Sequence, residues 1–338
     1  MRPHLNRLPG VKLRSCLGTI AGFLLLCSAL FGQEFKPRLT LLGHKARVMC
    51  VAVSPDGKML ASGGGDRTIR FWNVASGTEQ NTIKVSDGAD WIGSLALSPD
   101  GKTLASGGSG SGSNTVTLWD VGTGKGVALL KEGQCMDPVA VFSPDGKILA
   151  SAATFLRKTP VTFWDAKTRK QVAKTEEKLS VQALAITPDG KTAVVLGRRG
   201  GITSVQTATG KITARIKTND DSFAAAAFSP DAKTLATATW DETTVSLWAV
   251  ATGKQQVAIS VPERSVSCLV FSPDGKTLVT GGVDGTIKLW TVATGKEIAK
   301  LTGHFDEVHA LAFGLDGRLL ASGSSDQTIR LWDVPSQK

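Results

Sequence analysis

The 338-residue chain is poor in the side chains that most often carry catalysis or hold metals, with no tyrosine, four histidines and five cysteines. The histidines and cysteines are scattered, and none of them form a group at the spacing of metal ligands. The glycine-rich stretch 107–112 lacks the Gly-Lys-Ser/Thr ending and the following helix of a phosphate-binding loop, which favours a flexible hairpin tip. The sequence therefore predicts no metal, no cofactor and no catalytic residues.

Long hydrophobic runs are also missing. The longest apolar stretch covers residues 17–30, and at about 1.5 Å per residue it is too short to cross a hydrocarbon core of roughly 30 Å. Four basic residues and no acid precede it, namely Arg2, Arg7, Lys12 and Arg14. This pattern is typical of a secretory signal peptide over residues 1–32, with cleavage after Ala29 or Gly32. We expect a periplasmic or secreted protein; an uncleaved leader that anchors the chain in a membrane is the alternative.

The net charge does not indicate a nucleic-acid partner. Removing the four positive charges of the leader lowers the net charge from +10 to +6. Most of the remaining lysines occur once per turn and form no cluster, so we expect only weak attraction to anionic surfaces.

One turn recurs seven times. It reads Ser-Pro-Asp-Gly-Lys or a close variant, and it starts at residues 54, 98, 143, 187, 229, 272 and 314, spaced 42 to 45 residues apart. Proline fixes φ at the second position, serine and aspartate offer oxygens to backbone amides, and glycine takes the left-handed position. A period of this length with Gly-His and Trp-Asp pairs predicts an all-β, seven-bladed propeller over residues 37–334, followed by a short tail at 335–338.

The two ends of the propeller complement each other. The seventh repeat stops after its third strand, at Trp332-Asp333-Val334, whereas residues 38–42 form a lone strand before the first repeat. Pairing residues 38–42 with residues 328–332 would complete the seventh sheet and leave no open edge. We therefore expect the N- and C-terminal strands to share one blade and close the ring.

With these repeats, Gly-His pairs and Trp-Asp ends, the chain resembles the WD40 family over about residues 37–334. The resemblance implies a buried network that links the histidine, a second-strand Ser or Thr, a turn aspartate and the tryptophan. Two repeats carry the full set: His44, Ser62, Asp66 and Trp72, and His304, Ser322, Asp326 and Trp332. Other repeats keep only parts of it, and we expect these incomplete blades to be looser.

The fourth repeat departs furthest, with Val205 in place of the tryptophan and Arg198-Arg199 where the aspartate turn is expected. Cys50 and Cys268 occupy the same position in non-adjacent repeats, so they should lie too far apart for a disulfide and remain unpaired and buried. Among the histidines outside the leader, only His309 is left free of the implied networks.

The resemblance implies that partners bind the face with the loops before the first strand and between the second and third strands. Aromatic and arginine side chains on such a rigid face are typical binding hot spots. The candidates on that face are Arg47, Trp91, Met136, Arg157, Arg199, Trp240, Glu307 and His309. The insertions at residues 107–114 and 155–160 place the preferred patch over the first three repeats.

The sequence thus favours an exported, monomeric, non-enzymatic scaffold that binds a protein or peptide. One alternative is a propeller that binds carbohydrate or cell-wall polymer, with Trp91 and Trp240 as stacking platforms. Another is a metal-dependent propeller hydrolase, which would need several acidic or histidine side chains around the channel. The inner-strand positions are mainly Ala, Val, Ser and Cys, which disfavours the hydrolase.

Overall fold

The computed structural model describes residues 33–85, 90–109, 115–131, 136–155, 159–197, 200–218, 223–240, 243–261 and 266–334. Residues 34–338 form one compact unit, to which the architecture below applies. Every named element is a β-strand. Across the described ranges, no helix is long and apolar enough to span a membrane.

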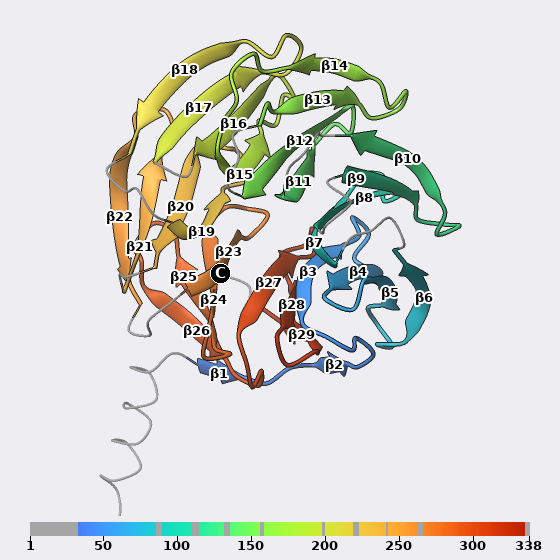
Figure 1. The fold of residues 1–338 in the computed structure, drawn as a ribbon. Helices are drawn as coiled ribbons and strands as arrows, with labels where there is room; N and C mark the ends of the chain where they lie inside the picture. The colour runs from blue at the N-terminus through green and yellow to red at the C-terminus, as the bar shows by residue number, and fades with distance from the viewer. Residues whose placement is uncertain are drawn as a thin grey trace, which may run out of the picture. The chain divides into compact units, whose positions relative to one another are not determined.

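The strands form seven antiparallel sheets, and these follow one another along the chain as the blades of the propeller (Figure 1). Blade 1 contains β3 (Val48–Val53), β4 (Met59–Gly64), β5 (Thr68–Asn73) and β6 (Glu79–Lys84). Blade 2 contains β7 (Trp91–Leu97), β8 (Thr103–Ser109), β9 (Thr115–Asp120) and β10 (Gly126–Lys131). Blade 3 contains β11 (Met136–Phe142), β12 (Ile148–Phe155), β13 (Thr162–Asp165) and β14 (Gln171–Lys174).

Blades 4 and 5 follow the same order of strands. Blade 4 contains β15 (Val181–Ile186), β16 (Thr192–Gly197), β17 (Gly201–Gln206) and β18 (Ile212–Lys217). Blade 5 contains β19 (Phe223–Phe228), β20 (Thr234–Thr239), β21 (Thr244–Ala249) and β22 (Lys254–Ser260).

The last two blades each take a strand from the N-terminal part of the chain. Blade 6 contains β23 (Val266–Phe271), β24 (Thr277–Gly282), β25 (Ile287–Thr291) and β26 (Glu297–Leu301), with β1 (Gln33–Phe35) beside β26. Blade 7 contains β27 (Val308–Phe313), β28 (Leu319–Ser324), β29 (Ile329–Asp333) and β2 (Leu39–Leu41). The seven-bladed all-β propeller expected from the repeats is confirmed.

β2 completes blade 7, as expected from the missing fourth strand. It pairs antiparallel with β29, with Leu39 opposite Leu331 and Leu41 opposite Ile329. The Arg38 guanidinium forms an ion pair with Asp333, Nη1 to Oδ1 3.1 Å, and donates to the Val74 carbonyl of blade 1 at 3.2 Å. The innermost strands contact their neighbours from blade to blade, and β27 of blade 7 contacts β3 of blade 1 (Figure 1).

The added strand β1 was not expected from the sequence. It runs along the outer edge of blade 6, and the Thr302 amide donates to the Phe35 carbonyl at 3.2 Å. The Lys36 ammonium donates to the Thr302 hydroxyl at 3.0 Å. The segment before the first repeat therefore extends one blade and completes the next.

The repeated turn has the chemistry that its sequence predicts. In the first copy the Ser54 hydroxyl donates to Asp56 at 2.6 Å, and the Asp56 carboxylate accepts the Lys58 amide at 3.0 Å. These hydrogen bonds hold the pKa of Asp56 below its ordinary value. Gly57 has φ +69°, the left-handed conformation that glycine adopts without strain. The turn thus fixes the first hairpin of each blade locally.

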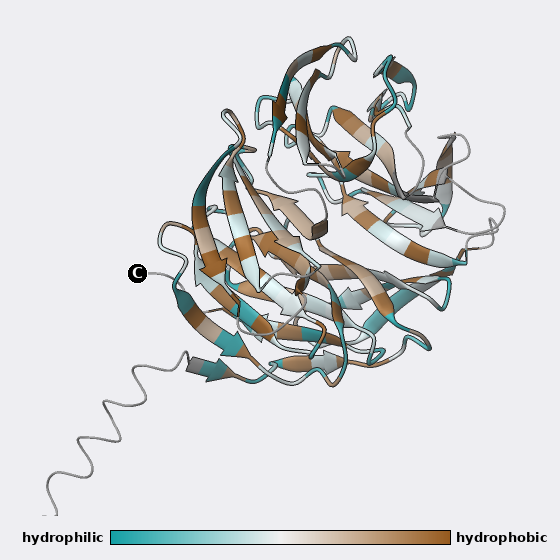
Figure 2. Cartoon of the chain, turned by 60° about the vertical axis from the view of Figure 1, so that its left-hand side comes forward, coloured by the Kyte–Doolittle hydropathy of each residue, from teal (hydrophilic) through white to brown (hydrophobic). Residues whose placement is uncertain are grey.

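Hydrophobic residues pack between neighbouring blades, and hydrophobic and hydrophilic stretches alternate along the strands (Figure 2). One core cluster joins blades 7 and 1 across the closure. Its members include Leu41, Val48, Leu60, Trp72 and Leu331. Leu41 of the closing strand is only 2% exposed, so β2 contributes to the core as well as to the sheet.

Blade 4 replaces a polar pair by an apolar one. Val205 stands opposite Ala193 in β16, the register position that Trp72 takes opposite Leu60 in blade 1. By the same register Val195 takes the place of Ser62, and both valines are buried. Exchanging both partners of a buried hydrogen bond for apolar groups leaves no polar atom unsatisfied.

Candidate functional site

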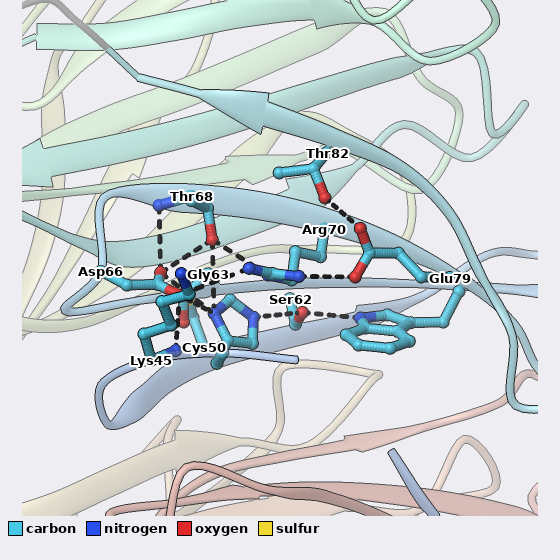
Figure 3. Close-up of polar contacts among 11 residues, drawn as sticks. Lys45, Cys50, Ser62, Gly63, Asp66, Thr68, Arg70, Glu79 and Thr82 are labelled. Carbon is cyan, nitrogen blue, oxygen red and sulfur yellow. Dashed lines mark hydrogen bonds and ion pairs between the residues drawn. The ribbon is translucent and has the colours of Figure 1, made fainter. Parts of the chain in front are cut away.

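The first histidine network lies at the end of blade 1 where β4 turns into β5. His44 Nδ1–H donates to the Asp66 carboxylate at 3.0 Å, because a carboxylate can only accept. The Ser62 hydroxyl donates to His44 Nε2 at 2.8 Å and accepts the Trp72 indole N–H at 2.9 Å. Figure 3 shows Asp66 at one end of this chain of hydrogen bonds and Ser62 between the imidazole and the indole. Each polar atom along the chain has a partner.

Asp66 remains charged within this network. Burial alone would raise its pKa, but hydrogen bonds from His44, the Lys45 amide and Thr68 outweigh it and hold the pKa well below the ordinary value. The Lys45 amide lies 2.9 Å and the Thr68 hydroxyl 2.7 Å from the carboxylate. The aspartate therefore fastens the loop before β3 to the turn after β4.

The second network repeats this arrangement in blade 7. His304 Nδ1 lies 2.8 Å from Asp326, and its Nε2 lies 2.7 Å from the Ser322 hydroxyl, which accepts the Trp332 N–H at 2.9 Å. Burial lowers the pKa of His304, and the charge of Asp326 opposes this only in part. His304 is thus a neutral structural group near neutral pH.

Four other blades lack the histidine but keep the hydrogen bond between the tryptophan and the second-strand hydroxyl. A tryptophan N–H donates to a second-strand hydroxyl at 2.7 to 3.0 Å in the pairs Trp119–Ser106, Trp164–Ser151, Trp248–Thr237 and Trp290–Thr280. The aspartate expected in blade 5, Asp241, lies outside the described residues. The greater looseness expected of these blades stays a prediction.

The cysteines of the inner strands are unsuited to nucleophilic chemistry. Cys50 and Cys268 are both free, as expected. Cys268 is only half-buried rather than buried as predicted, but its thiol lies 3.1 Å from the Val308 carbonyl. Burial raises the pKa of Cys50 and raises that of Cys268 to about 12. A thiol with such a raised pKa carries almost no thiolate at neutral pH.

Three predicted face residues meet at the seam between blades 7 and 1. His309 Nδ1 lies 3.7 Å from Glu307 Oε1, and its Nε2 lies 2.7 Å from the hydroxyl of Ser325. Burial lowers the pKa of His309; Glu307 opposes this, while the nearby positive charge of Arg47 adds to it. His309 thus belongs to neither histidine network, as expected, but its ring contacts Glu307 and Ser325. Arg47 itself is exposed.

Blade 2 extends this group through an ion pair. Arg67, in the β4–β5 turn of blade 1, lies 2.9 Å from Asp90, which directly precedes Trp91 at the start of β7. Trp91 is half-buried. Because Val48 pairs with Gly64, the start of β3 and the end of β4 lie at the same edge of the blade, so Arg47 and Arg67 share it. We call Arg47, Arg67, Asp90, Trp91, Glu307 and His309 the seam face.

The other predicted residues do not join the seam face. Trp240 follows β20 in blade 5, separated from blade 1 by blades 6 and 7, and it is 57% exposed. Met136 begins β11 in blade 3. Arg157 and Arg199 lie outside the described residues, as do most positions of the two insertions. The preferred patch over the first three repeats stays a prediction, and the described residues that come together belong to blades 7, 1 and 2.

Sequence reasoning missed Arg67, Asp90 and Ser325. Arg67 and Ser325 sit in turns that the repeat explains structurally, and no pattern separates them from other turn residues. The pairing of His309 with Ser325 depends on a 16-residue separation that only the antiparallel β27–β28 register brings together. A hairpin built from the predicted bounds of these two strands would have placed His309 and Ser325 at the same edge of the blade.

In the part of the chain that the structure describes, no three His, Cys, Asp or Glu side chains gather as metal ligands would. The two buried histidines have both ring nitrogens engaged. What the geometry offers is a rigid edge with charged and aromatic side chains, which suits binding better than bond making or breaking.

Comparison with known proteins identifies the repeats. The family model "WD domain, G-beta repeat" (WD40) matches residues 35–73, 77–120, 253–291 and 295–333. These segments supply most of the strands of blades 1, 2, 6 and 7, on both sides of the closure. The chain carries WD40 repeats, and they fold as part of a seven-bladed propeller.

Curated relatives are similar over about one repeat. "Notchless protein homolog" of Arabidopsis thaliana is 51% identical over 45 residues, which is 13% of this chain and 10% of the relative. "Protein FIZZY-RELATED 2" of the same plant is 57% identical over 44 residues, or 13% and 9%. "Ribosome biogenesis protein erb1" of Neosartorya fischeri is 44% identical over 60 residues, or 16% and 8%. The chain spans about a tenth of the length of these relatives.

Proposed function

We propose that this propeller of WD40 repeats is a non-enzymatic scaffold that binds a protein partner through the seam face. The observation that carries the proposal is the convergence of Arg47, Glu307 and His309 from two blades at the point where the ring closes. One relative, "Ribosome biogenesis protein erb1", is named for an assembly process, which agrees with this proposal.

The seam face has the composition of a binding hot spot. Arginine and tryptophan dominate the energetics of protein interfaces, and a rigid scaffold lowers the entropy lost on binding. Arg47 is exposed and has no ion pair among the described residues, while Trp91 stands half-buried on the neighbouring blade. The ion pair with Arg67 connects Asp90, the residue before Trp91, to blade 1.

Capture of partner proteins from an extract of the source cells tests this proposal. The variant Arg47→Ala/Trp91→Ala should lose at least about 2 kcal/mol of binding free energy, about a 30-fold loss of affinity. Trp240→Ala, which removes the exposed tryptophan of blade 5, is the matched control and should capture as the parent does. If the control loses capture while the double variant keeps it, the seam face is not the binding surface.

We further propose that the protein is exported. The support is the basic and then apolar pattern of residues 1–32. Cell fractionation and N-terminal sequencing test this. The mature chain should be found outside the cytoplasm and begin near residue 30 or 33, and a cytoplasmic chain with an intact leader would contradict the proposal.

Binding of carbohydrate is the second candidate, and the 57% exposure of Trp240 favours it. An exposed indole offers a flat apolar surface on which a sugar ring can stack. The same capture experiment separates the two candidates, since glycan captured through Trp240 would be lost in Trp240→Ala and kept in the seam-face variant.

A further inference from the structure

A pocket of about 350 Å³ opens on blade 1, beside the histidine network. Its walls come from the loop before β3, the β4–β5 turn and the outer strands β5 and β6. The lining residues are Lys45, Asp66, Arg67, Thr68, Arg70, Thr82, Lys84 and Val85. Figure 3 shows Lys45, Asp66, Thr68, Arg70 and Thr82 along this side of the blade. We call it the rim pocket.

Positive charge predominates in the rim pocket. Four of its lining residues are basic and only Asp66 is acidic. The Asp66 carboxylate is already occupied, because it accepts hydrogen bonds from His44, the Lys45 amide and Thr68. Asp66 also lies 3.9 Å from Arg70 Nη2, whereas it forms no ion pair with the ammonium groups of Lys45 and Lys84.

Two of the four cations have carboxylate partners and two do not. Arg70 pairs with Glu79 at 2.5 Å, and Arg67 pairs with Asp90 at 2.9 Å. Lys45 and Lys84 are both exposed, and among the described residues neither forms an ion pair. A group of like charges is costly to hold together unless an anion compensates it.

The repeat itself shows that the fold does not require these lysines. Blade 6 has a pocket of only about 10 Å³ beside its Asp284 turn, and the single cation that lines it, Lys288, lies 3.9 Å from Glu297. In blade 7 the register puts Phe305 at the position of Lys45, and Leu42 at that of Lys84. Blade 7 therefore folds with neither of the two rim-pocket lysines.

Blade 7 offers an apolar surface beside the rim pocket. Phe305 is 87% exposed and Leu42 is 72% exposed. The Arg330 guanidinium lies over the Phe305 ring, with its central carbon 5.4 Å from the ring centre. The buried Nε of Arg330 has no hydrogen-bond partner among the described residues. Only two residues separate Leu42 from Lys45, so the apolar surface and the pocket lie within about 11 Å of each other.

We propose that the rim pocket binds acidic side chains of a peptide segment whose neighbouring apolar side chain packs on Phe305 and Leu42. This inference rests on the proposed function and names the chemistry of the partner. Because the rim pocket is positively charged, charge complementarity favours an acidic peptide over a basic one. Carboxylates contact Lys45 and Lys84, which are the cations left without partners.

Fluorescence anisotropy with a defined probe tests the inference. The probe is a fluorescein-labelled peptide of one leucine followed within three residues by three glutamates, titrated with the purified full chain. We expect saturable binding that weakens as salt rises, since exposed charges are screened over about 10 Å at 0.1 M. The same peptide with glutamines for glutamates should bind at least tenfold more weakly.

Two charge-reversal variants complete the test. Lys45→Glu/Lys84→Glu should weaken binding at least tenfold and Phe305→Ala should weaken it severalfold. Lys58→Glu/Lys102→Glu makes the same charge change at exposed lysines in the hairpin turns at the opposite edge of blades 1 and 2, and should bind like the parent. Equal losses in the two double variants would show general attraction to a basic protein and overturn the inference.

Inorganic phosphate serves as the competitor that separates a peptide site from a simple anion site. Millimolar phosphate should displace the probe only partially at constant ionic strength, because it cannot use Phe305. Complete displacement, with no effect of Phe305→Ala, would overturn the peptide part. Because the probe is defined, failure here leaves partner capture through the seam face as a separate result.

Discussion

At the scale of single residues, the histidine networks are structural groups with an electrostatic consequence. His304 is 6% exposed and donates to a carboxylate that remains charged. Its lowered pKa means that the folded chain binds fewer protons than the unfolded chain just below the ordinary histidine pKa of about 6.5. The contribution of His304 to the free energy of unfolding is therefore complete above about pH 6.5 and is lost as the pH falls below this value.

The first prediction follows from this sign. The melting temperature of the parent should fall as the pH is lowered from 7 to 5, and His304→Asn, which cannot titrate, should fall less steeply. His309 also has a lowered pKa, so some slope should persist in the variant. Thermal denaturation at several pH values measures both curves, and parallel curves would show that His304 does not contribute.

At the scale of elements, the closing strand β2 ends in a core residue, and the residue that follows it is exposed. Leu41 is 2% exposed and packs in the cluster that joins blades 7 and 1, whereas Leu42 is 72% exposed. The same chemical deletion at the two positions should therefore have very different costs.

We expect Leu41→Ala to lower the free energy of unfolding by about 2–5 kcal/mol, the usual cost of a cavity at a buried leucine. Leu42→Ala should change it by no more than about 0.5 kcal/mol, as surface substitutions usually do. Denaturant titration measures both. Equal effects would mean that β2 does not pack against β29 as the structure shows.

The sequence predicts most of these elements because their causes are local. The Ser-Pro-Asp-Gly turns determine where the hairpins fall, and the lone strand predicted at residues 38–42 contains the observed β2. The strand β1 could not be predicted, since Gln33–Phe35 has no repeat signature and its position depends on pairing with β26. The seam face was foreseen only in part, because its contacts join residues of different blades.

At the scale of the whole molecule, binding depends on closure of the ring. The seam face lies where β27 of blade 7 meets β3 of blade 1, and the chain passes from β2 of blade 7 into the loop before β3, which lines the rim pocket. If β2 were released, β29 would become an open edge, and Arg47 and His309 would no longer be held together. Function and closure should therefore be lost together.

Hydrogen–deuterium exchange of β29 in the intact protein tests this closure most directly. If β2 covers β29, the amides of Ile329–Asp333 should exchange as slowly as those of Ile287–Thr291 in β25, which also lies between two strands. Exchange of Ile329–Asp333 at the rate of an uncovered edge strand would contradict a ring closed by the N-terminal segment.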